Sequence, residues 1–503
     1  MCRPRRPWLR LIPARAWRWA APVLMLIALW IPGANQGWWR VDTGLYAAIA
    51  LHAWREGPLF PLMAGDQPYF NKPPLAFWVH GLFLHALGKE LWVARLPALM
   101  AAIGATLILM RCVRLLSGDR AAFAAGIILA STVEFFRASR SFSLDLWLTM
   151  WVIASVWPVA EVVRGRAPGR VAALAGLPIG GALLTKPIVG LFMLTLLACW
   201  LVWIGRARLT PWLGVGAILA LGVAAPWHLA MNAAFPDEFV GAYFGRQSLD
   251  RAAGSAFGTD PWWTYLTLMS RTWWPWLPVV IVGALGAARK GDAGARLALV
   301  SFCGWLCAIS LFAAKEPRYA IVVYPFGAWL AGWWLGGHAP RAVIRARRAL
   351  DCWGPPVALA GAAALSGVRV HAPPSEHWRT LGEFLRSHPG ARLWADPTGV
   401  MRWTTSNIYL MTGQWPRTAA IDSDSELLRP IAPTLGLGAR GSPDVGDLFI
   451  TRTDAPLGPR ATDEPLWSSG PLRVSRVRTP WDGQVVPQAG SVAHSMLDST
   501  SDR

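Results

Sequence analysis

Charged side chains are scarce in this sequence. They make up 15% of its 503 residues, whereas 54% of the residues are hydrophobic. Apolar runs of about 18–22 residues recur along the chain, which is the length that an α-helix needs to cross a bilayer. So small a charged fraction with so many long apolar runs excludes an ordinary soluble domain, and the composition predicts a polytopic α-helical membrane protein.

Acidic residues are fewer than basic ones. The chain has 29 Asp and Glu against 48 Lys and Arg, which gives a formal net charge of +19. In a soluble protein this balance would suggest a nucleic-acid partner. Here the basic residues fall in short loops between apolar runs, where they orient helices in the membrane. The charge is therefore evidence about membrane topology, and we expect no nucleic-acid binding.

Lysine is rarer still, with five residues in the whole chain. Three of them, Lys72, Lys186 and Lys315, lie in short polar breaks of the apolar sequence. Arginine is the basic residue at nearly all other positions. The use of lysine here therefore indicates that a compact ammonium is needed, as a point charge that binds phosphate. A codon bias that spared three lysines by chance is the alternative.

Several familiar signals are missing. The six cysteines imply no disulfide framework. The chain has no HExxH, paired CxxC, Walker loop or GxSxG that serves a coherent site. No clear cleavage site follows the N-terminal apolar stretch, which predicts an uncleaved signal anchor. The pair Gly180-Gly181 lies in an apolar run and predicts close helix packing.

Placing the basic loops in the cytoplasm gives eleven ordered spans, within an expected total of about 11–13. Residues 1–18 form a basic cytoplasmic N-terminus, and an outer loop at 35–90 carries the short apolar segment Leu75–Leu87, predicted to lie at the membrane interface. The spans are about 19–34, 92–111, 121–137, 145–161, 171–184, 188–204, 211–230, 264–288, 295–313, 319–336 and 353–368.

The chain changes character after this membrane region of residues 19–370. Trp378–Leu385 predicts a helix, and Ala391–Ala395 and Asp447–Thr451 predict short strands. We therefore expect a small extracytoplasmic α/β domain over 371–483. A disordered tail is predicted over 484–503, because that stretch is rich in Ser and Asp.

Two carboxylates fall on the outer side in this topology. Asp42 follows the first span and precedes Tyr46–Trp54, which is predicted to be an amphipathic helix along the membrane surface. Asp145 begins the span 145–161. Either acid could simply cap a helix. Carboxylates at the membrane rim are costly, so two that converge on one outer cavity favour a functional role.

Four cations fall on the same side: Lys72, Lys186, Lys315 and Arg318. Together they could surround a phosphate, although any one of them could instead be a cation that anchors a helix end. His228, which follows Pro226-Trp227, is either a metal ligand or a histidine at the membrane interface.

The motifs together resemble a known family. In family order they look like those of the aminoarabinose transferases of lipid A and the related protein mannosyltransferases, over about residues 20–335. These are integral-membrane glycosyltransferases of the GT-C superfold. The motifs are the first-loop Asp42, Tyr69-Phe70-Asn71-Lys72-Pro73-Pro74-Leu75, Ser143-Leu144-Asp145, Leu184-Thr185-Lys186, Pro226-Trp227-His228 and Lys315…Pro317-Arg318-Tyr319…Tyr324-Pro325.

The resemblance implies an activity and a location. The donor would be a polyprenyl-phosphate sugar, the acceptor lipid A, a protein or another glycan, and the sugar would be transferred with inversion at the periplasmic face. The protein would be a monomer in the bacterial inner membrane, with its N-terminus in the cytoplasm and its C-terminal domain in the periplasm. No nucleotide or other cofactor is implied.

The resemblance also implies roles for residues. Asp42 would be the base and Asp145 its helper, with the four cations on the donor phosphate. The substrate cavity would be lined by Tyr46, Tyr69, His228 and Tyr319. The chain departs from the family at three positions: Thr43 and Leu45 stand where a second acid and an arginine are usual, and Asn71 replaces the usual Glu, which makes a divalent metal site doubtful.

Two other classes remain open from the residues alone. A lipid or glycan transporter would also have many helices and charges within the membrane, but we would expect related halves and broken helices near the midplane, whereas the charges here gather at one rim. The other alternative, a structural membrane protein, does not explain why the lysines lie in the polar breaks.

Overall fold

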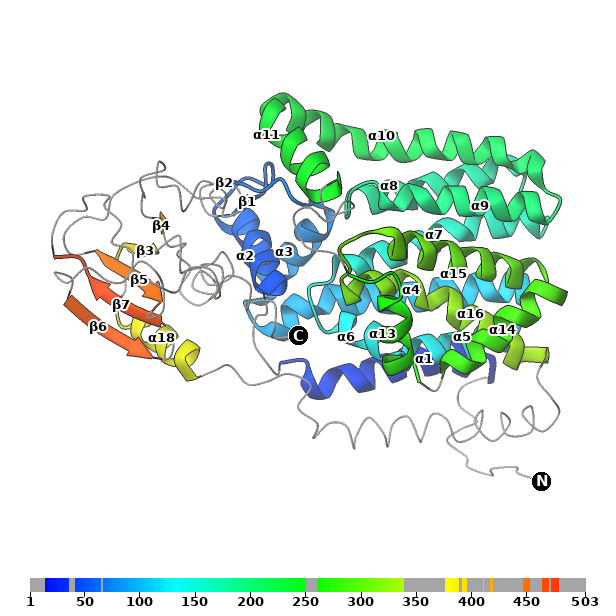
Figure 1. Cartoon of the computed structure of the whole chain (residues 1–503), viewed down its shortest axis with the longest axis horizontal. Helices are drawn as coiled ribbons and strands as arrows, with labels where there is room; N and C mark the ends of the chain where they lie inside the picture. The colour runs from blue at the N-terminus through cyan, green and yellow to red at the C-terminus, as the bar shows by residue number, and fades with distance from the viewer. Residues whose placement is uncertain are drawn as a thin grey trace, which may run out of the picture. The chain divides into compact units, whose positions relative to one another are not determined.

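The computed structural model describes two compact units of the chain (Figure 1). Unit 1 comprises Met1–Asn35, Phe70–His80 and Trp92–Arg369, and unit 2 comprises Gln36–Tyr69, Gly81–Leu91 and Val370–Arg503. The described residues are 14–35, 41–64, 67–249, 260–274, 276–338, 376–388, 391–395, 410, 417–418, 447–452, 464–469 and 472–478.

The regular secondary-structure elements in the described part of unit 1 are all helices. A helix satisfies its own backbone hydrogen bonds, which is why apolar runs of this kind take that form in lipid. Helix α3, Leu75–Leu87, crosses the division between the two units. The elements of unit 1 are α1 (Ala14–Trp30), η2 (Ile31–Gly33), α4 (Leu91–Ser117), α5 (Asp119–Ala130), α6 (Val133–Ser139), α7 (Leu144–Val163), η3 (Gly169–Ala175), α8 (Gly176–Leu183), η4 (Val189–Leu191), α9 (Phe192–Trp203), η5 (Ala207–Leu209), α10 (Thr210–Ala234), α11 (Pro236–Val240), η6 (Gly241–Leu249), α13 (Thr264–Thr272), α14 (Trp276–Lys290), α15 (Ala293–Leu311), η7 (Pro317–Val322), α16 (Tyr324–Trp333) and η8 (Trp334–His338).

Five helical segments of the described residues are long and apolar enough to cross a membrane, and the bent pair α5–α6 could make a sixth. They are Ala16–Gly33, Leu91–Ser117, Leu144–Val163, Ala207–Ala234 and Ala293–Leu311. The segments Gly169–Leu183 and Val189–Trp203 are shorter apolar helices, as is α3. Each predicted span from 19–34 to 319–336 overlaps one or more helices, and the predicted span 353–368 lies outside the described residues.

Two predicted spans differ from the structure. The expected helix 264–288 is two helices, α13 and α14, and the sequence places Pro275 between them, where a proline cannot donate to a helical hydrogen bond. The expected helix 121–137 bends by 67° between α5 and α6. At that bend the hydroxyls of Ser131 and Thr132 donate back to carbonyls of the preceding turn at 2.8 Å, which competes with continuation of the helix.

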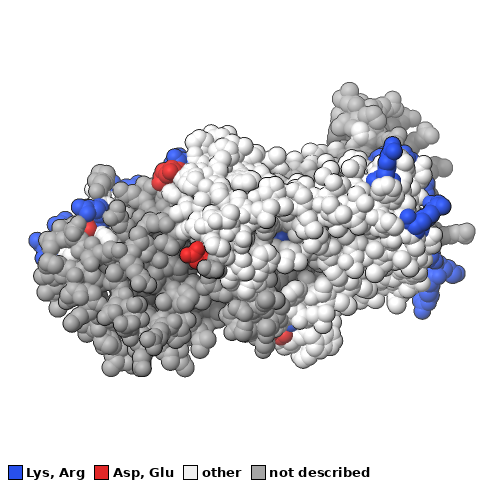
Figure 2. All heavy atoms as spheres, turned by 90° about the horizontal axis from the view of Figure 1, so that it is seen from above, with Lys and Arg blue, Asp and Glu red and all other residues white. Residues whose placement is uncertain are grey.

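The helices of unit 1 place arginine-rich turns at one end. Short turns join α4 to α5, α7 to η3, α9 to α10 and α14 to α15. The turns meet: Arg111 pairs with Glu161 at 2.6 Å, and Ser117 donates to Asp292 at 3.1 Å. Figure 2 shows a long stretch of white surface almost free of charge, with one group of blue side chains at its right-hand end. Exposed cations in these turns are Arg120, Arg164, Arg166, Arg170, Arg208, Arg289 and Lys290.

Glycines bring neighbouring helices close together, as Gly180-Gly181 predicts. Helix α8 packs on α10, and a Cβ added at Gly176 would collide with the carbonyl oxygen of Gly216. A Cβ at Gly180 would lie 2.5 Å from Cβ of Val223. Elsewhere in unit 1, α16 packs against α5, α14 and α15. Close backbone approach is a usual way for helices to associate in membranes.

Unit 2 contains α2 (Val41–Arg55), the strands β1 (Met63–Ala64) and β2 (Gln67–Pro68), and the described residues after 375. Its largest sheet has the order β4-β3-β5-β7-β6, with β3 parallel to β4 and β5 and the other pairs antiparallel. Helix α18 (Glu376–Arg386) packs on this sheet through Leu381 and Leu385. The strands are β3 (Leu393–Ala395), β4 (Arg417–Thr418), β5 (Leu448–Arg452), β6 (Glu464–Ser469) and β7 (Leu472–Arg476).

The elements expected for the C-terminal part, a helix at 378–385 and strands at 391–395 and 447–451, fall on α18, β3 and β5. One expectation for unit 2 differs from the structure. Helix α2 is buried on every face from Ala47 to Leu51, where each residue is 0% exposed, so it is not the amphipathic surface helix that its sequence suggests. The predicted tail 484–503 lies outside the described residues.

Candidate active site

Asp145 lies in the first turn of α7. Ser143 caps this helix, because its Oγ accepts a hydrogen bond from the Leu146 N–H at 3.2 Å. Asp145 is 7% exposed, and its carboxylate lies at the helix N-terminus, where the helix dipole stabilises negative charge. Ser143, and not Asp145, therefore caps this helix. The Asp145 carboxylate can then bind other partners.

Lys186 is the first of those partners. It lies in the turn after α8, where its backbone N–H donates to the Ala182 carbonyl at 2.8 Å. Its ammonium donates to Oδ1 of Asp145 at 2.5 Å and lies 4.1 Å from the centre of the Tyr319 ring. The ring face adds a cation–π attraction to the ion pair, so Lys186 is held on two sides.

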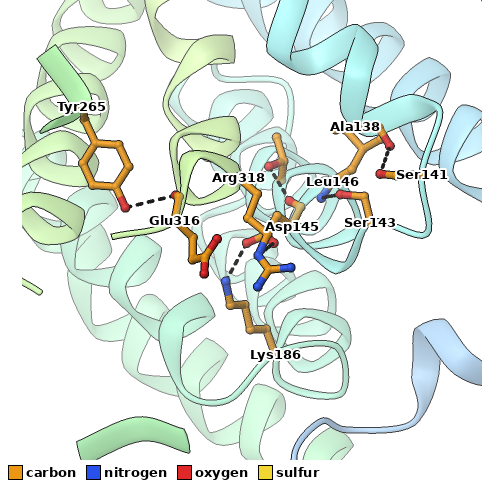
Figure 3. A network of polar contacts seen from close by, with 10 residues as sticks. Ala138, Ser141, Ser143, Asp145, Leu146, Lys186, Tyr265, Glu316 and Arg318 are labelled. Carbon is orange, nitrogen blue, oxygen red and sulfur yellow. Dashed lines mark hydrogen bonds and ion pairs between the residues drawn. The ribbon is translucent and has the colours of Figure 1, made fainter. Parts of the chain in front are cut away.

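Arg318 is the second partner. It comes from the 3₁₀-helix η7, and its Nε lies 4.0 Å from Oδ2 of Asp145. Figure 3 shows Asp145 between Lys186 and Arg318, with the three side chains contributed by different elements of unit 1. One carboxylate balances only one of the two cations. Two cations thus share the Asp145 carboxylate, an arrangement whose cations can also attract an anionic ligand.

Lys72 belongs to the same end of unit 1. The N–H of Leu75, three residues further on, donates to the Leu184 carbonyl at 3.0 Å, and Leu184 lies two residues before Lys186. This bond ties the Asn71–Leu75 element to the turn that carries Lys186. Lys72 is 8% exposed, so its side chain is buried.

Lys315 has other contacts. Its ammonium donates to the carbonyls of Asp260 at 2.8 Å and Phe312 at 2.7 Å, and its own N–H donates to Oδ2 of Asp260 at 3.1 Å. These bonds close the segment before α13 onto the end of α15. The structure thus gives Lys315 a part in holding this loop, and its predicted role in binding phosphate stays a prediction.

His228 is part of an aromatic cluster. Its Nδ1 lies 2.9 Å from the Ala224 carbonyl and its Nε2 lies 3.0 Å from the Tyr243 hydroxyl. A carbonyl can only accept, so Nδ1 carries the proton, and in the neutral ring Nε2 accepts from Tyr243. Burial raises the pKa of Tyr243, which keeps this donor protonated. Both ring nitrogens have partners within the protein, which disfavours the metal-ligand alternative for His228; its predicted place in the substrate cavity stays a prediction.

The cluster around His228 reaches the site itself. Trp227, Met231, Phe239 and Tyr243 form its buried core. Phe70 and Leu184 pack against that core, and they flank Lys72 and Lys186 in the sequence. His228 and Tyr243 therefore belong to an aromatic cluster that packs against the two segments carrying Lys72 and Lys186.

The remaining candidates lie in unit 2. Asp42 is the second residue of α2, and its side chain lies outside the described residues. Tyr46 and Tyr69 are both buried, and the backbone N–H of Tyr69 donates to the Leu62 carbonyl at 2.7 Å. The predicted roles of these three residues stay predictions.

Two residues of the cluster were not foreseen. Tyr265 of α13 is fully buried and its hydroxyl donates to the Glu316 carbonyl at 3.2 Å. Figure 3 shows the Glu316 side chain directed toward Lys186. Glu316 stands inside the quoted Lys315–Tyr319 motif and could have been noticed there. No sequence signal points to Tyr265, because its partner lies 51 residues away.

No described residues form a group of three or more His, Cys, Asp and Glu side chains that could hold a metal ion. Asn71, which stands where the family usually has Glu, supplies only a neutral amide oxygen. The described residues therefore do not fit a divalent metal site, and we assign no step to a metal.

Comparison with known proteins agrees with the motifs. Residues 71–229 match the family of dolichyl-phosphate-mannose-protein mannosyltransferases. An undecaprenyl phosphate-α-4-amino-4-deoxy-L-arabinose arabinosyl transferase of Pseudomonas fluorescens Pf-5 is 28% identical over 60% of this chain and 54% of its own length. The corresponding Pseudomonas aeruginosa LESB58 protein is 30% identical over 58% and 54%. The chain thus spans about half the length of the curated relatives that it matches.

Solved structures share the fold. ArnT from Cupriavidus metallidurans in the apo state has a TM-score of 0.72 at 18% identity, covering 93% of this chain and 97% of ArnT. The oligosaccharyltransferase AglB from Archaeoglobus fulgidus, in complex with an inhibitory peptide and a dolichol-phosphate, has a TM-score of 0.55 at 12% identity, covering 89% and 70%. Nothing in these comparisons supports the transporter alternative. The resemblance expected from the motifs is therefore confirmed: this chain is a multi-pass protein of the bacterial inner membrane that has the fold of ArnT.

Proposed function

We propose that this protein transfers a sugar from a polyprenyl-phosphate donor to a lipid or protein acceptor at the periplasmic face of the inner membrane. The observation that carries the proposal is the Asp145 carboxylate shared between Lys186 and Arg318. Lys186 and Arg318 can donate to the phosphodiester of such a donor, which carries one negative charge. The relatives named above are transferases of this donor class.

In the proposed reaction the donor phosphate binds to Lys186 and Arg318, with Lys72 close by. The bond between the anomeric carbon and the phosphate oxygen breaks, and its electron pair stays on the polyprenyl phosphate. The cations stabilise the charge that develops on this leaving group. An acceptor oxygen attacks from the opposite face of the sugar, which inverts the anomeric centre, and its proton passes to a carboxylate base.

Asp145 and Asp42 have different parts in this scheme. Asp145 is already bound to Lys186, so it holds that cation in place and is a poor base in this arrangement. Asp42 remains our candidate for the base, on the resemblance to the family. Tyr46, Tyr69 and Tyr319 would line the sugar-binding side.

A transfer assay tests the proposal. Membranes containing the wild-type protein are supplied with radiolabelled polyprenyl-phosphate sugars, with aminoarabinose in the panel, and label is followed into lipid and protein fractions. We expect label in one fraction with the wild type, and a loss of about 10²–10⁴-fold in rate for Asp42→Asn if it removes the base.

The other outcomes are equally decisive. Equal labelling by wild type and Asp42→Asn would remove Asp42 from the mechanism. An absence of label with every donor, in membranes shown to contain folded protein, would contradict the proposed function.

A further inference from the structure

His80 is a buried histidine that the proposed reaction does not use. It lies in α3, in the part of that helix that belongs to unit 1, and it is 0% exposed. Its Nδ1 lies 2.8 Å from the carbonyl oxygen of Ala94 on α4, and its Nε2 lies 3.1 Å from Nε1 of Trp147 on α7. One side chain thus joins three helices of unit 1.

The two partners determine where the proton of this ring lies. A carbonyl can only accept, so Nδ1 carries the proton and donates to Ala94. An indole N–H can only donate, so Nε2 accepts from Trp147. The neutral ring protonated on Nδ1 satisfies both partners, and no apolar side chain of the same size can do so.

His80 contacts the chain before and after Asp145. Trp147 follows Asp145 by two residues, and Phe142 precedes it by three. The Phe142 ring stacks on the imidazole, with ring centroids 3.7 Å apart and an interplanar angle of 18°. Phe142 stands directly before Ser143, which caps α7. The imidazole therefore holds both the loop that leads to Asp145 and the helical turn that follows it.

Helix α3 also reaches the two lysines of the site. It begins at Leu75, three residues after Lys72, and the Leu75 N–H donates to the Leu184 carbonyl beside the Lys186 turn. The start of α3 is thus tied to the Lys186 turn, and His80 ties the same helix to the turn of Asp145. The position of Lys72 relative to the Asp145–Lys186 pair therefore depends on these two connections.

We infer that His80 is a positioning residue for sugar transfer, which fixes the Asp145 turn relative to the segment that carries Lys72. It acts through Trp147 and Phe142, because a fully buried ring is not open to substrate. The inference rests on the proposed function, since it takes the cation cluster to be the binding site of the donor phosphate. A displacement of about 1 Å at such a site can cost up to 10²-fold in rate.

Two measurements on the full-length protein in maltoside detergent test this inference. One is the KM and kcat for the donor in the transfer assay. The other is the concentration of undecaprenyl phosphate that gives half of its thermal stabilisation of the protein, which requires no transfer. His80→Phe keeps a ring against Phe142 and loses both hydrogen bonds. We expect it to raise the KM and the half-stabilising concentration by about 10–100-fold, with a smaller change in kcat.

Trp329→Phe is the matched control. Trp329 is 0% exposed, and its Nε1 donates to the Ser117 hydroxyl at 3.2 Å, at the arginine-rich end of unit 1. This variant also removes a buried hydrogen bond of a tryptophan. It should lower the Tm as His80→Phe does and leave both donor measurements at the wild-type values.

Partial replacements separate the two bonds of His80. A glutamine amide reaches about the position of Nε2 and can accept from Trp147, whereas an asparagine amide reaches about the position of Nδ1 and can donate to Ala94. We expect His80→Gln to lie closer to wild type in KM than His80→Asn. Should His80→Phe fail to fold, Trp147→Phe removes the same bond from α7 and should raise the KM in the same way.

Three outcomes would overturn the inference. One is a His80→Phe protein with a lowered Tm and wild-type donor measurements, which would make His80 a packing residue only. Another is a Trp147→Phe protein that keeps the wild-type KM, and the third is an equal KM for His80→Gln and His80→Asn. A wild-type protein that neither transfers sugar nor is stabilised by undecaprenyl phosphate would instead contradict the proposed function itself.

Discussion

Lys186 combines two contacts within the protein with a proposed role in binding the donor. It is bound by Asp145, faces the Tyr319 ring, and is proposed to receive the donor phosphate. Its ammonium can donate in three directions, so it can keep Asp145 while it binds a ligand. An arginine could also stack on the ring and pair with the carboxylate, but its donors lie in one plane and cannot point in three directions from a single nitrogen.

We therefore expect Lys186→Met to raise the KM for the donor by about 10–100-fold, which is the usual value of a charge-assisted hydrogen bond. Steady-state kinetics with a short-chain donor would measure it. Lys290→Met is the control, because Lys290 is exposed in the turn between α14 and α15. A variant that folds and keeps the wild-type KM would show that Lys186 serves only the ion pair with Asp145.

Among the elements, α8 and α10 position the Lys186 turn and the aromatic cluster around His228. Helix α8 leads directly into the turn of Lys186, and α10 carries His228. Their spacing depends on Gly176 and Gly216, whose backbones meet. A change in this spacing would displace the turn that holds Lys186.

We expect Gly176→Ala to lower the stability of the protein by about 1–3 kcal/mol, as overpacking does in general. Thermal unfolding in detergent would show it as a lower Tm. Gly214→Ala on α10 is the matched control, since a Cβ there meets nothing within 4 Å, and it should be neutral. Equal Tm values for both variants would mean that α8 and α10 can separate without cost.

For the molecule as a whole, the two ends of unit 1 predict its orientation. By the positive-inside rule we expect the arginine-rich turns in the cytoplasm, and Asp145 with its partners at the periplasmic face. The N-terminus would then be cytoplasmic and the C-terminal part periplasmic. A donor whose phosphate lies at the outer headgroup level would meet the cluster there.

Cysteine labelling of the full chain tests this orientation. In a cysteine-free background, Trp262→Cys should react with a membrane-impermeant maleimide in intact spheroplasts. Arg208→Cys should react only after the membrane is permeabilised. Both residues are exposed and lie near opposite ends of unit 1. The reverse pattern would invert the topology and place the cluster in the cytoplasm.

The sequence by itself determined the helical class, the positions of most spans and the motifs that resemble a family. These follow from apolar runs and from the spacing of a few polar residues, which are local properties of the chain. It also indicated Asp145, Lys186 and Arg318, because polar breaks between apolar runs are conspicuous. The break at Pro275 could have been foreseen on the same ground.

Only the tertiary structure decided which of these residues meet. Asp145 and Lys186 are 41 residues apart, and only the packing of α7 against α8 brings them within 2.5 Å. Lys315, with the same kind of motif, turns instead to the carbonyls of Asp260 and Phe312. Arg140 follows α6 in a short polar stretch of the chain, and nothing local in the sequence indicates that it is only 3% exposed. Burial and pairing depend on residues far apart in the chain, and no local pattern records them.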